Sequence, residues 1–559
     1  MRYSVRWLLA LVLFSAALAP QRQVAAAPAA ANGVVGDGTP ASCTEAELTT
    51  EMSSPGYITF ACGAAPFALV LTVSGGHALT FGQRLTLDGG GLITLSGANV
   101  DDHRLFSVGI GAALTLTHLS LVNATMLTGP GGALANQGVL TLDDVVISHA
   151  RAQSVYGGGA IYNQGSLTIR NSTLRQNSSA GGGAIYNQVG AQARIVNTTF
   201  VSNTVLGGAY GGAISNSGWL TVTDSSFAGN ALTLNVACAS TYCGGGAIGN
   251  LAGGSVVVTA TTFTSNTTNN SGGGILNMGS LRLALLTVND NLAAYGGGVA
   301  NVLTGTVELD RVIVRANQAA VGAGLLNNLN GHLLIYDSMV LNNVAEDRAG
   351  GLVNGDSHAV LQRVTFAGNR ANNAGGGIEN TDNGTLSIEN STFTGNQAGA
   401  AGGAIWNHIG LASLTYVTVS ENTSAAVGSG GLDNSNDTSS SLSLQNTVLA
   451  DNQPANCAGK PAWQVTYSLS TDNTCMGSGN GNLPNTAQLL GPLANNGGPT
   501  LTRLPAPGSA AVDNGQCLGG YTLDQRGLPQ LVGAGCDIGA VERQVDDYGW
   551  YVFLPAALR

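Results

Sequence analysis

Hydrophobic and polar residues alternate along most of the chain in short segments that Gly or Asn brackets. Clear copies of one form, L-x-I-x-N-S-T-F-x-x-N, occur at 167–177, 193–203, 220–230 and 386–396. A period of two is the pattern of a β-strand with one buried face. No stretch has helical periodicity long enough for a crossover helix. The pattern therefore predicts short strands joined only by turns.

A second, glycine-rich segment lies between these strands. It reads GGGAIYN at 157–163 and 181–187, GGGILN at 272–277 and GGGIEN at 375–380. Each copy ends in asparagine, about 27 residues after the previous one, and such a fixed period indicates a solenoid. The members are Asn136, Asn163, Asn187, Asn216, Asn250, Asn277, Asn301, Asn327, Asn354, Asn380, Asn407 and Asn434.

Strands that repeat in one direction and are joined only by turns must coil into a parallel β-helix. We expect an all-β fold, right-handed as parallel crossovers almost always are. About a dozen turns at ~4.8 Å give a rod of roughly 58 Å. An asparagine ladder is predicted from Asn177 to Asn452, because Asn tolerates the left-handed conformation of tight turns and its amide can bond the next copy. The predicted inward column is Leu174, Phe200, Phe227, Phe263, Val288, Val314, Val340, Phe366, Phe393, Val419 and Leu449.

The pattern also predicts the limits of the solenoid. Alternating segments before the array extend it, so the β-helix is expected over 85–452. Residues 32–84 are predicted to form an N-terminal cap, because an open end would expose unpaired strand edges. Within them, 44–52 suits a short helix with Thr44 as its N-cap. One long repeat places residues 231–243 in a loop.

Composition and charge narrow the class of function. Arg2, Arg6 and the apolar stretch Trp7–Ala19 predict a signal peptide over 1–31, with a retained membrane anchor as the alternative. Removing the three arginines of that segment takes the net charge from −11 to −14. Nucleic acid and polybasic membrane binding are therefore not expected. We predict a mature chain without a transmembrane helix, located outside the cell or on its surface, with no cofactor.

The eight cysteines fall into four local groups along the chain. On a rigid rod only local partners come within the ~7 Å Cα–Cα limit of a disulfide. We therefore predict the pairs Cys43–Cys62, Cys238–Cys243, Cys457–Cys475 and Cys517–Cys536. Zinc is the alternative, but no CxxC pair occurs and the histidines are scattered, so no metal is predicted.

The repeats resemble those of the polymorphic outer membrane proteins. GGGAIYN with STLRQN, and GGGIEN with STFTGN, carry the likeness over about 110–452. That family contains surface adhesins and secreted passenger domains, so the resemblance implies a surface-exposed β-helix.

The C-terminal part resembles the domain called choice-of-anchor Q. The matching segments are NNGGPTLTRLPAPGSAAVDNG at 495–515, LDQRGLPQ at 523–530 and CDIGAVE at 536–542. This resemblance implies such a domain over 453–543 of an exported bacterial protein. Asp524 and Arg526 in the second segment suit a turn with an ion pair. The apolar tail 544–559 is either a sorting tag or a final packed strand.

One charged column is a candidate catalytic site. Enzymes of this fold need either paired carboxylates or a Ca²⁺-binding acidic cluster with a basic residue, all on one groove. Arg311, Asp337 and Arg363 share one phase in three consecutive turns, with Asp310 and Glu389 one position earlier in their repeats. We predict an ion-pair ladder in which Asp337 lies between two guanidinium groups, rather than a catalytic groove.

These observations together predict an exported cell-surface protein that is a non-enzymatic adhesin or envelope scaffold. Its expected partners are surface glycans or proteins of host or neighbouring cells. The alternative is a carbohydrate-active β-helix enzyme, either a polysaccharide lyase or a glycoside hydrolase.

Overall fold

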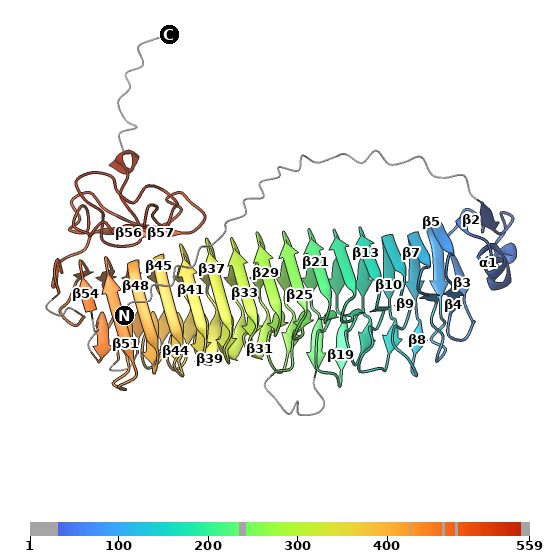
Figure 1. The fold of residues 1–559 in the computed structure, drawn as a ribbon, viewed down its shortest axis with the longest axis horizontal. Helices are drawn as coiled ribbons and strands as arrows, with labels where there is room; N and C mark the ends of the chain where they lie inside the picture. The colour runs from blue at the N-terminus through green and yellow to red at the C-terminus, as the bar shows by residue number, and fades with distance from the viewer. Residues whose placement is uncertain (1–31, 234–241, 426–427, 461–463, 476–478, 549–559) are drawn as a thin grey trace, which may run out of the picture.

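The computed structural model describes residues 32–233, 242–425, 428–460, 464–475 and 479–548. The chain forms an elongated parallel β-helix (Figure 1). Its strands make three long sheets of 28, 15 and 12 strands, which we call sheets A, B and C. The predicted fold class is confirmed. Sheet B has one strand in each turn, so its 15 strands exceed the predicted dozen turns.

One repeat shows how the sequence forms a turn. Sheet A receives β13 (Ser166–Arg170) and β14 (Thr173–Arg175), sheet C receives β15 (Ser178–Ser179), and sheet B receives β16 (Ile185–Asn187). Each strand pairs in parallel with its counterpart in the next turn, and β14 pairs with β18 (Thr199–Val201). The register joins equivalent positions of successive repeats.

The predicted inward column lies in the core. Phe227 and Phe393 are both 0% exposed, as predicted. In-register stacking places Phe200, Phe227 and Phe263 face to face, with ring centroids 4.7 and 4.9 Å apart and planes within 5°. The strand repeat therefore sets the spacing of the aromatic rings.

Two buried asparagine ladders run along the rod. The first joins Asn136 to Asn434 through eleven amide–amide hydrogen bonds of 2.7–2.9 Å. The second joins Asn177 to Asn452 at 2.8–3.0 Å. One expectation was wrong: the left-handed residue is the one before the asparagine, such as Ser202 with φ 53°. The asparagine is selected for its buried amide bonds.

The glycine pairs lie at the corner between sheets C and B, where successive turns approach most closely. A Cβ atom on Gly183 would lie 1.9 Å from the carbonyl oxygen of Gly212. One on Gly212 would lie 2.0 Å from the carbonyl oxygen of Gly246. Glycine therefore fits this corner in most turns, and the equivalent position holds alanine, Ala323, in one of them.

The short helix predicted over 44–52 is present at the N-terminal end. Helix α1 (Glu45–Glu51) begins after Thr44, whose side-chain oxygen accepts a hydrogen bond from the backbone N–H of Glu47 at 3.2 Å. Leu48 of the helix is fully buried in the core. Strand β1 (Gly33–Val35) pairs in parallel with β2 (Gly56–Phe60), which pairs with β5 (Arg84–Ser96).

The predicted bounds of the β-helix, 85–452, are too narrow. Sheet A begins at β1, inside the predicted cap, and ends with β55 (Leu469–Ser470), inside the predicted C-terminal domain. Strands at both ends pair in parallel without the repeated glycine and asparagine positions, so the repeat pattern did not reveal them.

Disulfides lie at both ends of the rod and in the C-terminal region. Cys43–Cys62, Cys457–Cys475 and Cys517–Cys536 are formed, with Cα–Cα distances of 5.5, 5.1 and 5.2 Å. Cys238 of the fourth predicted pair lies outside the described residues, as do the predicted signal peptide and residues 549–559. In the described part of the chain, no helix is long and apolar enough to cross a membrane.

The C-terminal region forms a small domain of loops around one antiparallel hairpin, β56 (Leu490–Ala494) and β57 (Thr502–Pro505). A buried ion pair supports its loops: Nε of Arg526 lies 2.9 Å from Oδ2 of Asp524, and the two side chains are 1% and 0% exposed. Arg526 also contacts Asp547 at 3.1 Å. This is the turn with an ion pair that the DQRG segment suggested.

This domain packs on the outer face of sheet A near its C-terminal end (Figure 1). The contact centres on Gln525, which is fully buried. Its Nε2 donates to the carbonyl oxygen of Val364 and to Oγ1 of Thr365, both at 3.0 Å. Its Oε1 accepts from Oγ1 of Thr392 at 2.6 Å.

The asparagine ladder should be a main source of stability. In Asn317, Nδ2 donates to Asn343 and to the carbonyl oxygen of Val288, both at 3.0 Å, and Oδ1 accepts from Asn291. Asn317→Ala should cost about 2–3 kcal/mol, because it leaves buried partners unpaired. Chemical denaturation should show this loss, and Asn372→Ala at an exposed site should not. Equal losses would contradict the role of the ladder.

Gln525→Ala should loosen the C-terminal domain while the rod survives. The substitution leaves the buried Thr392 hydroxyl and the Val364 carbonyl without this partner, at a cost of about 1–3 kcal/mol. Hydrogen exchange should then rise at Asp524 and Ile538, whose N–H groups donate to Leu528 and Ala511 inside the domain, and stay low at Thr392, whose N–H donates to Val364 inside the rod. Unchanged exchange at Asp524 and Ile538 would show that other contacts hold the domain.

Candidate functional site

The predicted charged column lies at the bend between the two strands that each turn gives to sheet A. Arg311, Asp337 and Arg363 have φ of 55°, 50° and 55°. The residue at this phase, six positions before each asparagine of the second ladder, is left-handed in every turn from Asn171 to Asn446, with φ between 46° and 56°. These residues therefore share one position in the repeat because the backbone bends there in every turn.

The column does not have the predicted alternation of ion pairs. Asp337 is held by Arg363, through bonds of 2.6 and 3.1 Å. Arg311 instead binds its sequence neighbour Asp310 at 3.1 and 3.2 Å, so Asp337 does not lie between two bound guanidinium groups. The adjacent carboxylate is the nearer partner for Arg311.

Glu389, the third acidic candidate, is engaged by the protein as well. Gln362 Nε2 donates to its Oε2 at 2.7 Å, and the hydroxyl of Tyr521 in the C-terminal domain donates to its Oε1 at 3.1 Å. All three carboxylates thus have protein partners: Asp310 and Asp337 pair with arginines, and Glu389 accepts hydrogen bonds from two neutral side chains.

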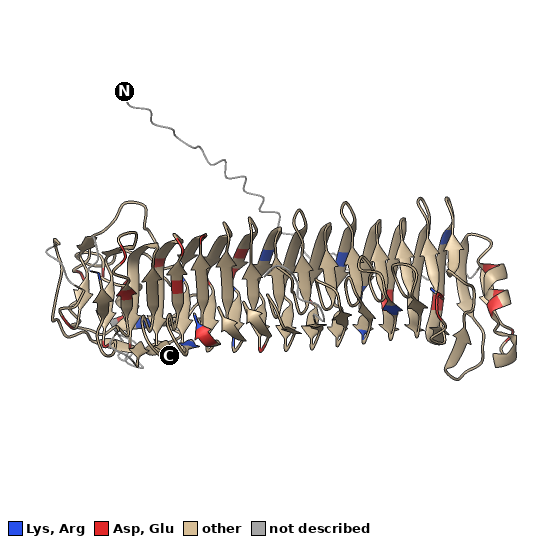
Figure 2. Ribbon diagram, turned by 90° about the horizontal axis from the view of Figure 1, so that it is seen from below, with Lys and Arg blue, Asp and Glu red and all other residues tan. Residues whose placement is uncertain are grey.

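The outer face of sheet B has a different character. Its outward positions immediately precede the asparagines of the first ladder, and we call this set the B-face column. It consists of Ala135, Tyr162, Tyr186, Ser215, Gly249, Leu276, Ala300, Leu326, Val353, Glu379, Trp406 and Asp433. Charged residues are sparse along the rod (Figure 2). Apolar and aromatic residues at outward positions depart from the alternation expected of a solvated strand, and this departure is visible in the sequence.

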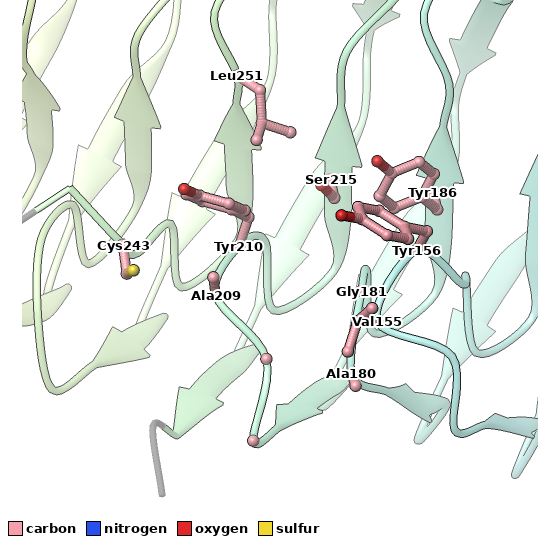
Figure 3. Close-up of a pocket in the computed structure, with 12 residues that line it drawn as sticks. Val155, Tyr156, Ala180, Gly181, Tyr186, Ala209, Tyr210, Ser215, Cys243 and Leu251 are labelled. Carbon is pink, nitrogen blue, oxygen red and sulfur yellow. The ribbon is translucent and has the colours of Figure 1, made fainter. Parts of the chain in front are cut away.

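A pocket of about 280 Å³ opens over the N-terminal half of this column. We call it the tyrosine pocket. Tyr186 and Tyr156 lie on one side of it and Tyr210 on the other, with Ser215 between them (Figure 3). Tyr186 stacks on Tyr162, with ring centroids 5.9 Å apart, and meets Tyr156 edge to face at 6.3 Å. Neighbouring turns thus hold the aromatic wall in place.

The tyrosine pocket combines apolar surface with a few polar groups. Val155 and Tyr156, which line it, are 60 and 67% exposed. Burial raises the pKa of Tyr186 and of Tyr210, so both phenols are protonated at neutral pH. Ser215 is 1% exposed, and its hydroxyl has no hydrogen-bond partner among the described residues.

A second pocket, of about 170 Å³, lies over the C-terminal half of the column. We call it the Glu379 pocket. Glu379 comes from β44 (Ile378–Thr381), is 0% exposed, and accepts a hydrogen bond at Oε1 from Nη1 of Arg348 at 2.8 Å. Its Oε2 has no partner among the described residues. Tyr242 and Tyr295 also line this pocket.

Burial raises the pKa of Glu379 to about 7, against the opposing pull of Arg348. The nearby carboxylates of Asp347 and Asp382 raise it further. The carboxyl group of Glu379 therefore titrates near neutral pH. The repeat pattern does not predict this titration, because Glu379 occupies a position that tyrosine, leucine or tryptophan holds in other repeats.

An apolar cluster joins the two pockets. Leu276, Ala300, Leu326 and Val353 of the B-face column are at most 7% exposed. Side chains that pack over them include Tyr210 and Leu251, which line the tyrosine pocket, and Tyr242 and Val321, which line the Glu379 pocket. The two pockets therefore lie at opposite ends of one continuous apolar strip.

Comparisons with known proteins agree with a repeat of this type. Residues 390–408 match the Chlamydia polymorphic membrane protein repeat. That segment runs from the left-handed Asn390 through Asn396 and the glycine corner to β47 (Ile405–His408). No curated protein matches the chain.

Among solved structures, the chain resembles the periplasmic alginate epimerase AlgG. The identity is 11%, the match covers 76% of this chain and 86% of that one, and the TM-score is 0.28. At this level the likeness has no bearing on function.

Glu379→Gln should stabilise the protein above neutral pH. Because its pKa rises from 4.5 to about 7 on folding, the folded state binds the extra proton. Its stability therefore falls as the pH rises from 4.5 to above 7, by about 3 kcal/mol. The variant lacks this loss, so its melting temperature should exceed that of the wild type more at pH 8 than at pH 5. Glu346→Gln, at an exposed site, should show no such trend. A difference independent of pH would refute the assigned titration.

Proposed function

We propose that this chain is an exported cell-surface protein that acts as a non-enzymatic adhesin and binds glycan in the tyrosine pocket. The carrying observation is the cluster of Tyr156, Tyr186 and Tyr210 around the unpartnered Ser215 hydroxyl. A concave apolar surface with a few convergent polar groups is typical of a small-molecule site. A sugar ring matches it, with C–H groups for the tyrosine faces and hydroxyls for the polar atoms.

Three features support export to the surface. The first 31 residues have the pattern of a signal peptide. Three disulfides suit an oxidising compartment. The match at 390–408 is to a repeat of a membrane protein family. We further propose that 453–543 serves as a choice-of-anchor Q-like domain ahead of the tail 544–559.

The engaged carboxylates favour the adhesin over the carbohydrate-active enzyme. Asp310 and Asp337 bind arginines, and Glu389 is covered by Tyr521. A retaining or inverting glycosidase would instead need two carboxyl groups facing one substrate. Release of reducing ends from a bound glycan would contradict the non-enzymatic assignment.

Binding to immobilised neutral oligosaccharides, such as cello-, xylo- and chito-oligosaccharides, tests this proposal. Tyr186→Ala and Tyr210→Ala should each weaken binding about 10- to 100-fold, the effect of losing ~1.4–2.7 kcal/mol. Tyr186→Phe keeps the ring and should bind much more like the wild type. Asp337→Ala alters the charged column and should leave binding unchanged.

Two results would contradict the proposal. One is a wild-type protein that binds none of these glycans. The other is binding that survives Tyr186→Ala and Tyr210→Ala but is lost in Asp337→Ala, which would place the ligand on sheet A.

A further inference from the structure

The Glu379 pocket contains polar groups that the fold leaves incompletely used. Oε2 of the buried Glu379 has no hydrogen-bond partner among the described residues. The Arg348 guanidinium carries five N–H donors, and its hydrogen bonds to Glu379 and Asp347 engage only part of this capacity. An acceptor and a donor thus lie side by side at one wall of the pocket. Neighbouring hydroxyls of a sugar ring offer the complementary pair, one to donate to the carboxyl oxygen and one to accept from the guanidinium.

The opposite surfaces of this pocket are apolar or aromatic. Tyr242, Tyr295, Val321 and Leu326 contribute to them. Such surfaces match the C–H groups of a sugar ring and leave its hydroxyls for the polar wall. A fully polar ligand would lose more hydrogen bonds to water on this apolar surface than it would form with the pocket.

The charges of the pocket restrict the ligand further. Glu379 and Asp382 line it together with a single arginine, Arg348. An anionic sugar such as a uronate would meet two acidic side chains and a guanidinium that is already paired. A neutral sugar has no such conflict, so we expect a neutral unit.

The position of the pocket relates it to the tyrosine pocket. Ser215 is in β20 (Ile214–Asn216) and Glu379 in β44, six strands further along sheet B. At ~4.8 Å for each step, the two residues are about 29 Å apart along a straight rod. The apolar strip of Leu276, Ala300, Leu326 and Val353 connects them. An extended chain of sugars laid along the rod would reach both pockets.

We propose that the Glu379 pocket is a second saccharide subsite, which binds a neutral sugar unit of the same extended glycan chain that occupies the tyrosine pocket. Glu379 and Arg348 bind adjacent hydroxyls, and Tyr242 and Tyr295 contact the ring. This inference rests on the proposed glycan binding, and its test separates the two.

The test compares a short and a long β-1,4-linked glucan on the intact protein. Cellobiose is too short to reach both pockets, whereas a mixture of longer soluble cello-oligosaccharides includes chains that approach the span. Because two linked contacts reinforce each other, the wild type should bind the long chains at least tenfold more tightly than cellobiose, by titration calorimetry. Glu379→Gln should remove that advantage and leave cellobiose binding unchanged. Arg348→Gln should do the same, and Tyr186→Ala should weaken both ligands.

The outcomes separate the two proposals. If Glu379→Gln and Arg348→Gln keep the full long-chain advantage while Tyr186→Ala weakens both ligands, the second subsite is refuted and the tyrosine pocket stands. If neither ligand binds the wild type, both proposals fall. Tighter binding of oligogalacturonates than of the neutral chains would refute the neutral ligand. Circular dichroism and melting at pH 5, where Glu379 is protonated, check that each variant is folded.

Discussion

The in-register stacking of parallel strands at ~4.8 Å governs this structure. Each repeat places its residues directly over those of the previous one, so a preference at one position becomes a column along the rod. Phenylalanines form a stack of rings, asparagines form ladders, and glycines form the tight corner between sheets C and B. The same rule places Tyr162 beside Tyr186, and Glu379 beside Trp406. The columns of residues in the core and on the surface therefore both follow from the spacing between stacked strands.

Much of the fold could be predicted because the repeat is visible in the sequence. The repeat period predicts the solenoid, and the alternation predicts that Phe227 and Phe393 point inward. The N-cap pattern at Thr44 predicts the N-terminal helix. The ends were harder to predict. Strands such as β1 and β55 pair in the same sheets, but they lack the glycine and asparagine positions that mark a repeat. Their pairing depends on the neighbouring turn more than on their own pattern.

The candidate site was harder to predict, for a different reason. Arg311, Asp337 and Arg363 were candidate site residues because they are charged and share one position in the repeat. The structure shows that they share this position because the backbone bends there. The distinctive face is apolar, and its residues lie one position before the asparagines of the first ladder. Its depth depends on side chains from other turns, such as Tyr210, Leu251 and Val321, that pack over the column. A sequence pattern shows the column and cannot show which distant side chains enclose it.

The two long faces of the rod differ in a way that bears on function. Near its C-terminal end, sheet A is covered by the small domain held through Gln525. Sheet B carries the tyrosine pocket, the apolar strip and the Glu379 pocket in one line. A crystal structure of the protein soaked with cello-oligosaccharide would test most directly whether sheet B is the binding face. The account predicts a sugar ring between Tyr186 and Tyr210, with the chain directed toward Glu379. A chain bound along Arg311, Asp337 and Arg363 would contradict it.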